Sequence, residues 1–214
     1  MPNWVKHNVT IRGSKEDIAR CHEQITKNDS ERGFSFNNII PMPESLNVTC
    51  GSPSHLAEIW GKASDEEKKK KIEAEKELTE EQIAEMQQVL DNIEKYGYPT
   101  WYEWSYDNWG TKWDVYDVEY EYVEEQISLH FDTAWSTPEP VFRKLSEQFP
   151  NLVIYVEFAD EDLGSNCGTY TLFKGEVQQE QLGDYEFACE IWGYDPEAEK
   201  EFLEDFEESG EENC

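Results

Sequence analysis

The chain carries a formal net charge of −30 over 214 residues, and this charge restricts what it can fold into. The charge is uneven: residues 1–50 hold six acidic and six basic residues, whereas residues 157–214 hold 19 acidic and two basic ones. Self-repulsion on this scale opposes compaction and influences the choice of partner. Aromatic residues nevertheless make up 14% of the chain. We therefore expect a folded core with acidic edges rather than global disorder.

Length and composition exclude several classes of protein. The length suits one large domain, or one domain with an inserted element. The sequence has no apolar run of about 18 residues and no secretory apolar segment at its start, so we expect a cytoplasmic protein without a membrane association. Its five cysteines form no C-x-x-C pair, which argues against a zinc or redox motif. We expect no cofactor and no bound metal.

One basic run raises the question of nucleic-acid binding. Lys68–Lys71 follows three acidic residues, and the acidic and basic side chains are spaced four residues apart, as on a solvated helix face. We expect no direct nucleic-acid binding from this run.

Residue spacing predicts the main elements. The β-forming residues of 4–12 alternate with polar ones, and Ser14 follows as a helix N-cap. Apolar residues recur at helical spacing after it. The complete set is a strand at 4–12, a helix at 15–28, strands at 34–40, 115–123 and 126–135, a helix opening at Pro138, and strands at 152–158 and 168–173.

Two further segments extend this pattern. Ser64 and Thr79 each begin a capping-box pattern, so 64–96 is predicted to be a helical insertion, and its charge also suits an interaction arm. Asp195 and Pro196 open an acidic C-terminal helix. The expected fold is an α+β, ferredoxin-like two-layer sandwich with these two additions. We expect a domain at 1–183 and an acidic extension at 184–214.

Four segments resemble a known family when taken in order. They are MPNWVKHNVTIRG at the start, FSFNNIIPMP at 34–43, YDNWGTKWD at 106–114 and FDTAWSTPEPVF at 131–142. They are similar to the phage- and plasmid-borne YubB-like family, over roughly residues 1–174 with a variable region at 60–98. The resemblance implies a ferredoxin-like domain and a mobile-element origin, hence a host-cell cytoplasm if phage-encoded. It implies no catalytic mechanism.

Carboxylates on the predicted strand 115–123 form the leading candidate site. Residues two apart share a face of a strand, about 6.6–6.8 Å from each other, so the acids form a row opposite a tyrosine-rich face. The row has the same order of charge spacing as a nucleic-acid backbone. The alternatives are that the acidic face of the sheet is merely solvated and that the acidic C-terminal tail only increases solubility. The predicted partner-binding residues are Asp117, Glu119, Glu121, Glu124 and Glu125, with Glu197, Glu201, Glu204, Asp205 and Glu208 in the C-terminal acids.

Other constellations are weaker. His130 and Asp132 share a strand face, but no nucleophile, base and orienting group are specified together. The acidic loop 160–171 departs from the EF-hand pattern at its glycine and at its last position. In the aromatic segment 101–113, Trp109 and Trp113 are expected in the core together with Trp135. Trp101 and Trp104 are the candidates for interface anchors.

These observations lead to one function and its alternatives. The leading hypothesis is a non-catalytic inhibitor and DNA mimic of the anti-CRISPR or anti-restriction type, acting on the cationic surface of a host defence nuclease. The first alternative is a small-ligand-binding protein or enzyme with 101–113 as a pocket wall. The second is a regulatory partner that binds through the 64–96 helices. The sequence leaves a dimer open.

Overall fold

The computed structural model describes residues 3–27, 33–48 and 80–200. The chain divides into two compact units, Met1–Ile40 with Trp109–Cys214, and Pro41–Asn108. The predicted helix at 64–78 and the residues after 200 lie outside the described residues. The predicted domain boundary after residue 183 stays a prediction.

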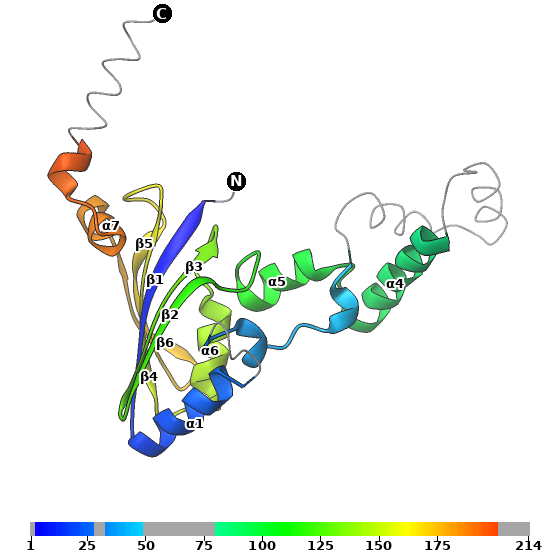
Figure 1. Ribbon diagram of the computed structural model, residues 1–214, viewed down its shortest axis with the longest axis horizontal. Coiled ribbons are helices and arrows are strands. Elements are labelled where there is room, and N and C mark those ends of the chain that lie inside the picture. Colours follow the sequence, from blue (N-terminus) through cyan, green and yellow to red (C-terminus); the bar gives the residue numbers. More distant parts are fainter. Residues whose placement is uncertain (1–2, 28–32, 49–79, 201–214) are drawn as a thin grey trace, which may run out of the picture. The chain divides into compact units, whose positions relative to one another are not determined.

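The first unit is built on one six-stranded antiparallel sheet, drawn in Figure 1. Its first four strands and the helices between them follow the β-α-β-β-α-β order of a ferredoxin-like fold, and two further strands extend the sheet beyond β4. The strand order is β2-β3-β1-β4-β5-β6. The strands are β1 (Trp4–Arg12), β2 (Tyr116–Val123), β3 (Gln126–Ala134), β4 (Val153–Asp160), β5 (Cys167–Phe173) and β6 (Glu176–Leu182). The expected α+β, ferredoxin-like class is confirmed.

Helices α1 (Lys15–Ile25) and α6 (Glu139–Gln148) cover one face of the sheet. Alternate residues of the central strands point into this layer and are fully buried, as period-two patterning requires. Phe34, Phe131 and Phe142 pack within 5.6–6.3 Å of one another, measured between ring centres. The first predicted helix therefore exists with its apolar face inward, three residues shorter than expected.

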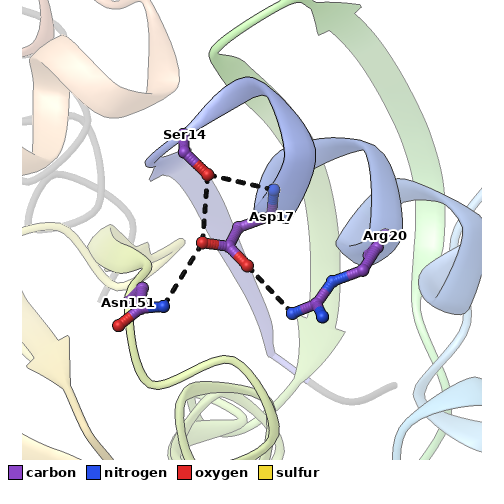
Figure 2. Close-up of polar contacts among 4 residues, drawn as sticks. All are labelled: Ser14, Asp17, Arg20 and Asn151. Carbon is purple, nitrogen blue, oxygen red and sulfur yellow. Dashed lines mark hydrogen bonds and ion pairs between the residues drawn. The ribbon is translucent and has the colours of Figure 1, made fainter.

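A polar network fixes the start of α1, as Figure 2 shows. The Oγ atom of Ser14 accepts a hydrogen bond from the backbone N–H of Asp17 at 3.2 Å, which is the predicted N-cap. The Asp17 carboxylate accepts from Arg20 at 2.9 Å and from Asn151 at 3.4 Å. These contacts join the β1–α1 turn to the loop before β4, so they serve the fold.

The prediction of a strand at 34–40 is wrong. Residues Phe36–Asn38 form a 3-10 helix instead. Asp114 accepts hydrogen bonds from the Ser35 hydroxyl at 2.6 Å and from the Phe36 N–H at 2.8 Å. Because a side chain satisfies these donors, the segment needs no neighbouring strand.

Two elements of the first unit lie beyond the prediction. Strand β6 pairs with β5 at the sheet edge, and α7 (Tyr185–Trp192) packs on the face opposite α1 and α6. The Asp184 carboxylate caps α7 through the Phe187 N–H at 3.0 Å. The Trp192 indole N–H is shared by the carbonyls of Ala159 and Asp160, both at 3.1 Å. The next helix begins at Pro196 with Asp195 as its cap, as predicted.

The second unit contains η2 (Glu44–Leu46), α4 (Glu80–Tyr96) and most of α5 (Trp101–Trp109). Met86 and Val89 form its apolar cluster, and Val48, Leu90 and Ile93 pack against them. The buried side-chain amide of Asn92 donates to the carbonyl oxygen of Ser45 at 2.7 Å and ties α4 to η2. The second half of the predicted insertion is therefore helical.

Candidate functional site

The face of the sheet opposite α1 and α6 carries the candidate site, and we call it the open face. Helix α7 packs on this side of the sheet around Ala159 and Cys167, and it also reaches β1, where the Lys6 ammonium lies over the Trp192 ring. The rest of the open face consists mainly of polar side chains, assigned from strand register. They are Lys6, Asn8, Thr10 and Arg12 of β1, Glu119 and Glu121 of β2, Ser128, His130 and Asp132 of β3, Val153, Tyr155 and Glu157 of β4, Thr169 and Thr171 of β5, and Gln179 and Gln181 of β6.

A row of these polar residues crosses all six strands. Cross-strand pairing places Glu119 beside His130, His130 beside Asn8, and Asn8 beside Glu157. The row continues through Thr169 to Gln181. The Nδ1 atom of His130 lies 2.7 Å from the Oδ1 atom of Asn8, so a hydrogen bond links β3 and β1 within this row.

Strand β2 contains an irregularity that shapes the site. Its pairing with β3 shifts between Tyr116 and Glu119, and Asp117 has a φ of 50°, in the left-handed region. Aspartate tolerates this conformation better than most residues. Such a bulge redirects side chains, and here it brings Asp117 to the same pocket as Glu119.

The structure places the predicted row in two groups. Glu119 and Glu121 are exposed on the open face, and Asp117 joins them through the bulge. Glu124 and Glu125 instead form the turn between β2 and β3, where Glu124 pairs with Lys15 at 2.5 Å. This surface pair contributes little to stability. The first group, rather than all five residues, forms the ordered array.

The predicted C-terminal acids are mostly beyond the described residues. Glu197 is exposed in the first turn of the last helix. Glu201, Glu204, Asp205 and Glu208 lie outside the described residues. Their part in partner binding stays a prediction.

A pocket of about 220 Å³ lies on the open face between β1, β2, β3 and α7. We call it the His130 pocket. It is lined by Lys6, Asn8, Asp117, Glu119, His130, Phe131, Asp132 and Ile191. Three carboxylates thus meet one lysine and one histidine in a single hollow. The sequence alone grouped His130 with Asp132 and, separately, Asp117 with Glu119.

The charge state of Asp132 reflects this pocket. Partial burial raises the pKa of its carboxyl to about 6, and the nearby carboxylates of Asp117 and Glu161 act in the same direction. Lys6 favours the charged form of Asp132, but burial and the two carboxylates outweigh its effect. The Nζ atom of Lys6 lies 4.6 Å from the ring centre of Trp192. The pocket therefore holds more negative charge than its own lysine compensates.

Two further pockets open onto the same face. One of about 340 Å³ lies over β4, β5 and β6 and includes Thr169 and Gln181. Another of about 280 Å³ lies between β1 and β4 and includes Thr10, Arg12 and Val153. Tyr155 lines both of them. The open face is therefore hollowed at three places across its width.

Aromatic residues gather near one end of this face, and their burial differs from the prediction. Tyr116 is 62% exposed and stacks on Trp4 at 5.1 Å between ring centres. Trp113 and Trp135 are not in the core, because they are 37% and 38% exposed. The Lys112 ammonium lies over both of their rings. Trp104 is buried rather than an exposed anchor, and Trp109 is buried as expected.

The described residues offer no metal centre. Among residues 3–27, 33–48 and 80–200, no three histidine, cysteine or acidic side chains are placed to hold an ion. In the acidic loop, the Asp160 carboxylate accepts hydrogen bonds from Asn3, from the Asp162 N–H and from Asn166. This carboxylate stabilises its own turn. Within the same residues, none of the helices has the length and apolar character to span a bilayer.

Comparisons with known proteins bear on the fold. None of the curated proteins compared with the chain matches it. The crystal structure of a protein api92 from Yersinia pseudotuberculosis is similar over 86% of this chain and 98% of that chain, with 12% identity and a TM-score of 0.48. Residues 108–207 match the family model described as "Ferredoxin-like domain in Api92-like protein", so this part of the chain is similar to that domain.

Proposed function

We propose that this protein is a non-catalytic inhibitor whose open face occupies the cationic nucleic-acid-binding surface of a defence nuclease. The observation that carries the proposal is the set of carboxylates gathered on one rigid sheet face, Asp117, Glu119, Glu121, Asp132 and Glu157. Lys6 and Arg12 are the basic residues assigned to the same described face. A CRISPR effector or a restriction enzyme supplies the required basic channel, and a mobile-element origin explains why such an inhibitor exists.

The spacing of the carboxylates suits this role. Glu119 and Glu121 stand about 6.6–6.8 Å apart along β2. Glu119 and Glu157 are separated by three strand spacings, about 14 Å in all. That distance is on the order of the ~12 Å width of a DNA major groove. The carboxylates are therefore spaced on the scale of the phosphates that border the groove.

The sheet also holds the charges in place. β1 and β3 are paired on both sides, so the backbone that carries the neighbouring carboxylates loses little further freedom on binding. Like charges on one sheet face are unfavourable in the free protein. A cationic partner removes this cost, and it also speeds the encounter through long-range attraction.

The alternative of a small ligand held by the 101–113 segment receives less support. Trp104 and Trp109 are buried, and the three pockets described above are lined by other residues. Those pockets lie on the anionic open face. Docking of a cationic protein therefore explains more features of this face than binding of a small ligand does.

An inhibition assay tests the proposal. A guide-loaded CRISPR effector and a restriction enzyme are each given target DNA with increasing amounts of the protein, at about 50 mM and about 200 mM salt. We expect inhibition that weakens steeply with salt. The double variant Glu119→Lys with Glu121→Lys should lose it. The control Glu23→Lys with Glu94→Lys changes the net charge equally at exposed helix positions outside the sheet and should retain it. Equal loss in both variants would mean that net charge, not the open face, is responsible.

A further inference from the structure

We propose that the His130 pocket binds an arginine side chain of the partner protein. The inference depends on the function proposed above and specifies the contact at its centre. The pocket has room for a side-chain head group, since its volume of about 220 Å³ far exceeds the ~30 Å³ share of a water molecule. Its lining comes from three adjacent strands, which makes it a preformed site.

The charges of the pocket select a cation. Asp117, Glu119 and Asp132 line it from β2 and β3, against Lys6 from β1. The hydrogen bond between His130 and Asn8 occupies the facing atoms of these two side chains. A bound cation would relieve the repulsion that Asp117 and Glu161 impose on Asp132. An anionic ligand would add to it.

The cation is an organic one rather than a metal ion. Over the described ranges, no three acidic, histidine or cysteine groups stand close enough to coordinate a metal, and the pocket's carboxylates are included in that finding. Carboxylates spaced around a hollow suit a larger donor, which reaches several of them at once.

Arginine fits this arrangement better than lysine. Its planar guanidinium presents five N–H donors in fixed directions and pairs with carboxylates through two parallel hydrogen bonds. It also stacks on aromatic rings. Tyr116 pairs with Asp132 across β2 and β3, so an exposed ring that is stacked on Trp4 stands beside the pocket. Carboxylates in the pocket and an aromatic ring at its edge are together what a guanidinium binds.

A titration with small probes tests this contact without the partner. N-acetylarginine amide is added to the full-length protein, and the ring of His130 and the side-chain amide of Asn8 are followed by NMR. We expect saturable shifts with a dissociation constant on the order of millimolar. N-acetyllysine amide should bind more weakly, and N-acetylcitrulline amide, which has the same shape without the charge, should not bind. No saturable shift with the arginine probe, or equal shifts with citrulline, overturns the proposal.

Matched variants locate the site. Glu119→Gln should weaken binding of the arginine probe about tenfold, because it removes a charge-assisted hydrogen bond. Glu23→Gln, at an exposed position of α1 outside the open face, should leave it unchanged. Equal effects of both variants contradict the pocket. Unchanged amide spectra elsewhere confirm that each variant is folded.

The two proposals fail separately. If the protein inhibits a nuclease but does not bind the arginine probe, the pocket assignment is wrong and the open-face function stands. If it binds the arginine probe but inhibits neither nuclease, the pocket assignment stands and the proposed function is wrong.

Discussion

The Nδ1 atom of His130 on β3 lies 2.7 Å from the Oδ1 atom of Asn8 on β1, at a directly paired position of the sheet. An amide oxygen only accepts hydrogen bonds, so Nδ1 must carry a proton. This contact fixes the imidazole at the centre of the polar row. The histidine thereby becomes a positioned part of the open face rather than a freely rotating surface group.

This contact predicts the tautomer of His130. When the ring is neutral, we expect the proton on Nδ1, because the Asn8 oxygen stabilises that form. The ¹⁵N chemical shifts of the ring at about pH 8 report it directly. In an Asn8→Ala variant the preference should disappear. A proton on Nε2 in the unsubstituted protein would show that the amide is reversed.

His7 is expected to make the protein sensitive to acid. It is fully buried and stacks on Phe131 at 4.8 Å between ring centres, and burial lowers its pKa to about 3. The nearby backbone of Val5 and Phe131 acts in the opposite direction on this pKa but is outweighed. Below the unfolded pKa of about 6.5, only the unfolded chain takes up this proton. The contribution of His7 is thus complete above pH 6.5 and is lost by ~1.4 kcal/mol per pH unit down to about pH 3.

A His7→Phe variant isolates the contribution of His7 to the pH dependence of stability. Acidification also relieves the repulsion among the carboxylates, but both proteins share that effect. The free energy of unfolding, measured with urea at pH 7.5 and pH 5, should shift in favour of the variant by about 2 kcal/mol on going to pH 5. A difference that does not change with pH would show that His7 has the same pKa in the folded protein as in the unfolded chain.

Asp132 is expected to act in the opposite sense. Its pKa is raised to about 6 by burial and by the neighbouring carboxylates, so the folded protein holds this proton over a pH range in which the unfolded chain has released it. Stability is therefore lost as the pH rises from about 4 through about 6. Asp132→Asn should raise the melting temperature at pH 7.5 and leave it nearly unchanged at pH 4. A variant that is less stable at pH 7.5 would refute this.

Helix α7 is expected to depend on its cap. Asp184 accepts the Phe187 N–H at 3.0 Å, and α7 carries Ile191 to the His130 pocket. Asp184→Ala should cost ~1 kcal/mol, whereas Asp184→Asn should cost little because asparagine caps equally well. Hydrogen exchange of the α7 amides is the measurement. Equal protection in the two variants would mean that packing around Ala159 alone holds the helix.

The sequence predicts the elements whose pattern is regular. Strand β1 alternates buried and polar residues, and α1 follows a clear cap, so both were predictable. Strand β6 was not, because Glu176–Leu182 is polar on both faces and lies at the sheet edge. Helix α7 is short, and its polar face consists of only Glu186 and Glu190. In both cases packing on the sheet, rather than local propensity, determines the structure.

The candidate site was predictable only in part. The alternation within β2 marks Glu119 and Glu121 as neighbours on one face. The His130 pocket also needs Lys6, Asn8 and Asp117, and their meeting depends on long-range strand pairing and on a bulge. Polar alternation in both β1 and β3 was the available signal, because it implies that the face opposite the core is open to solvent.

Competition with DNA tests the open-face proposal most directly. A nuclease that the protein inhibits is mixed with labelled duplex DNA and then titrated with the protein, and the complexes are separated by size. If the open face occupies the DNA channel, the protein displaces the DNA completely, and the Glu119→Lys with Glu121→Lys variant does not. A stable complex that contains nuclease, DNA and protein together would contradict DNA mimicry.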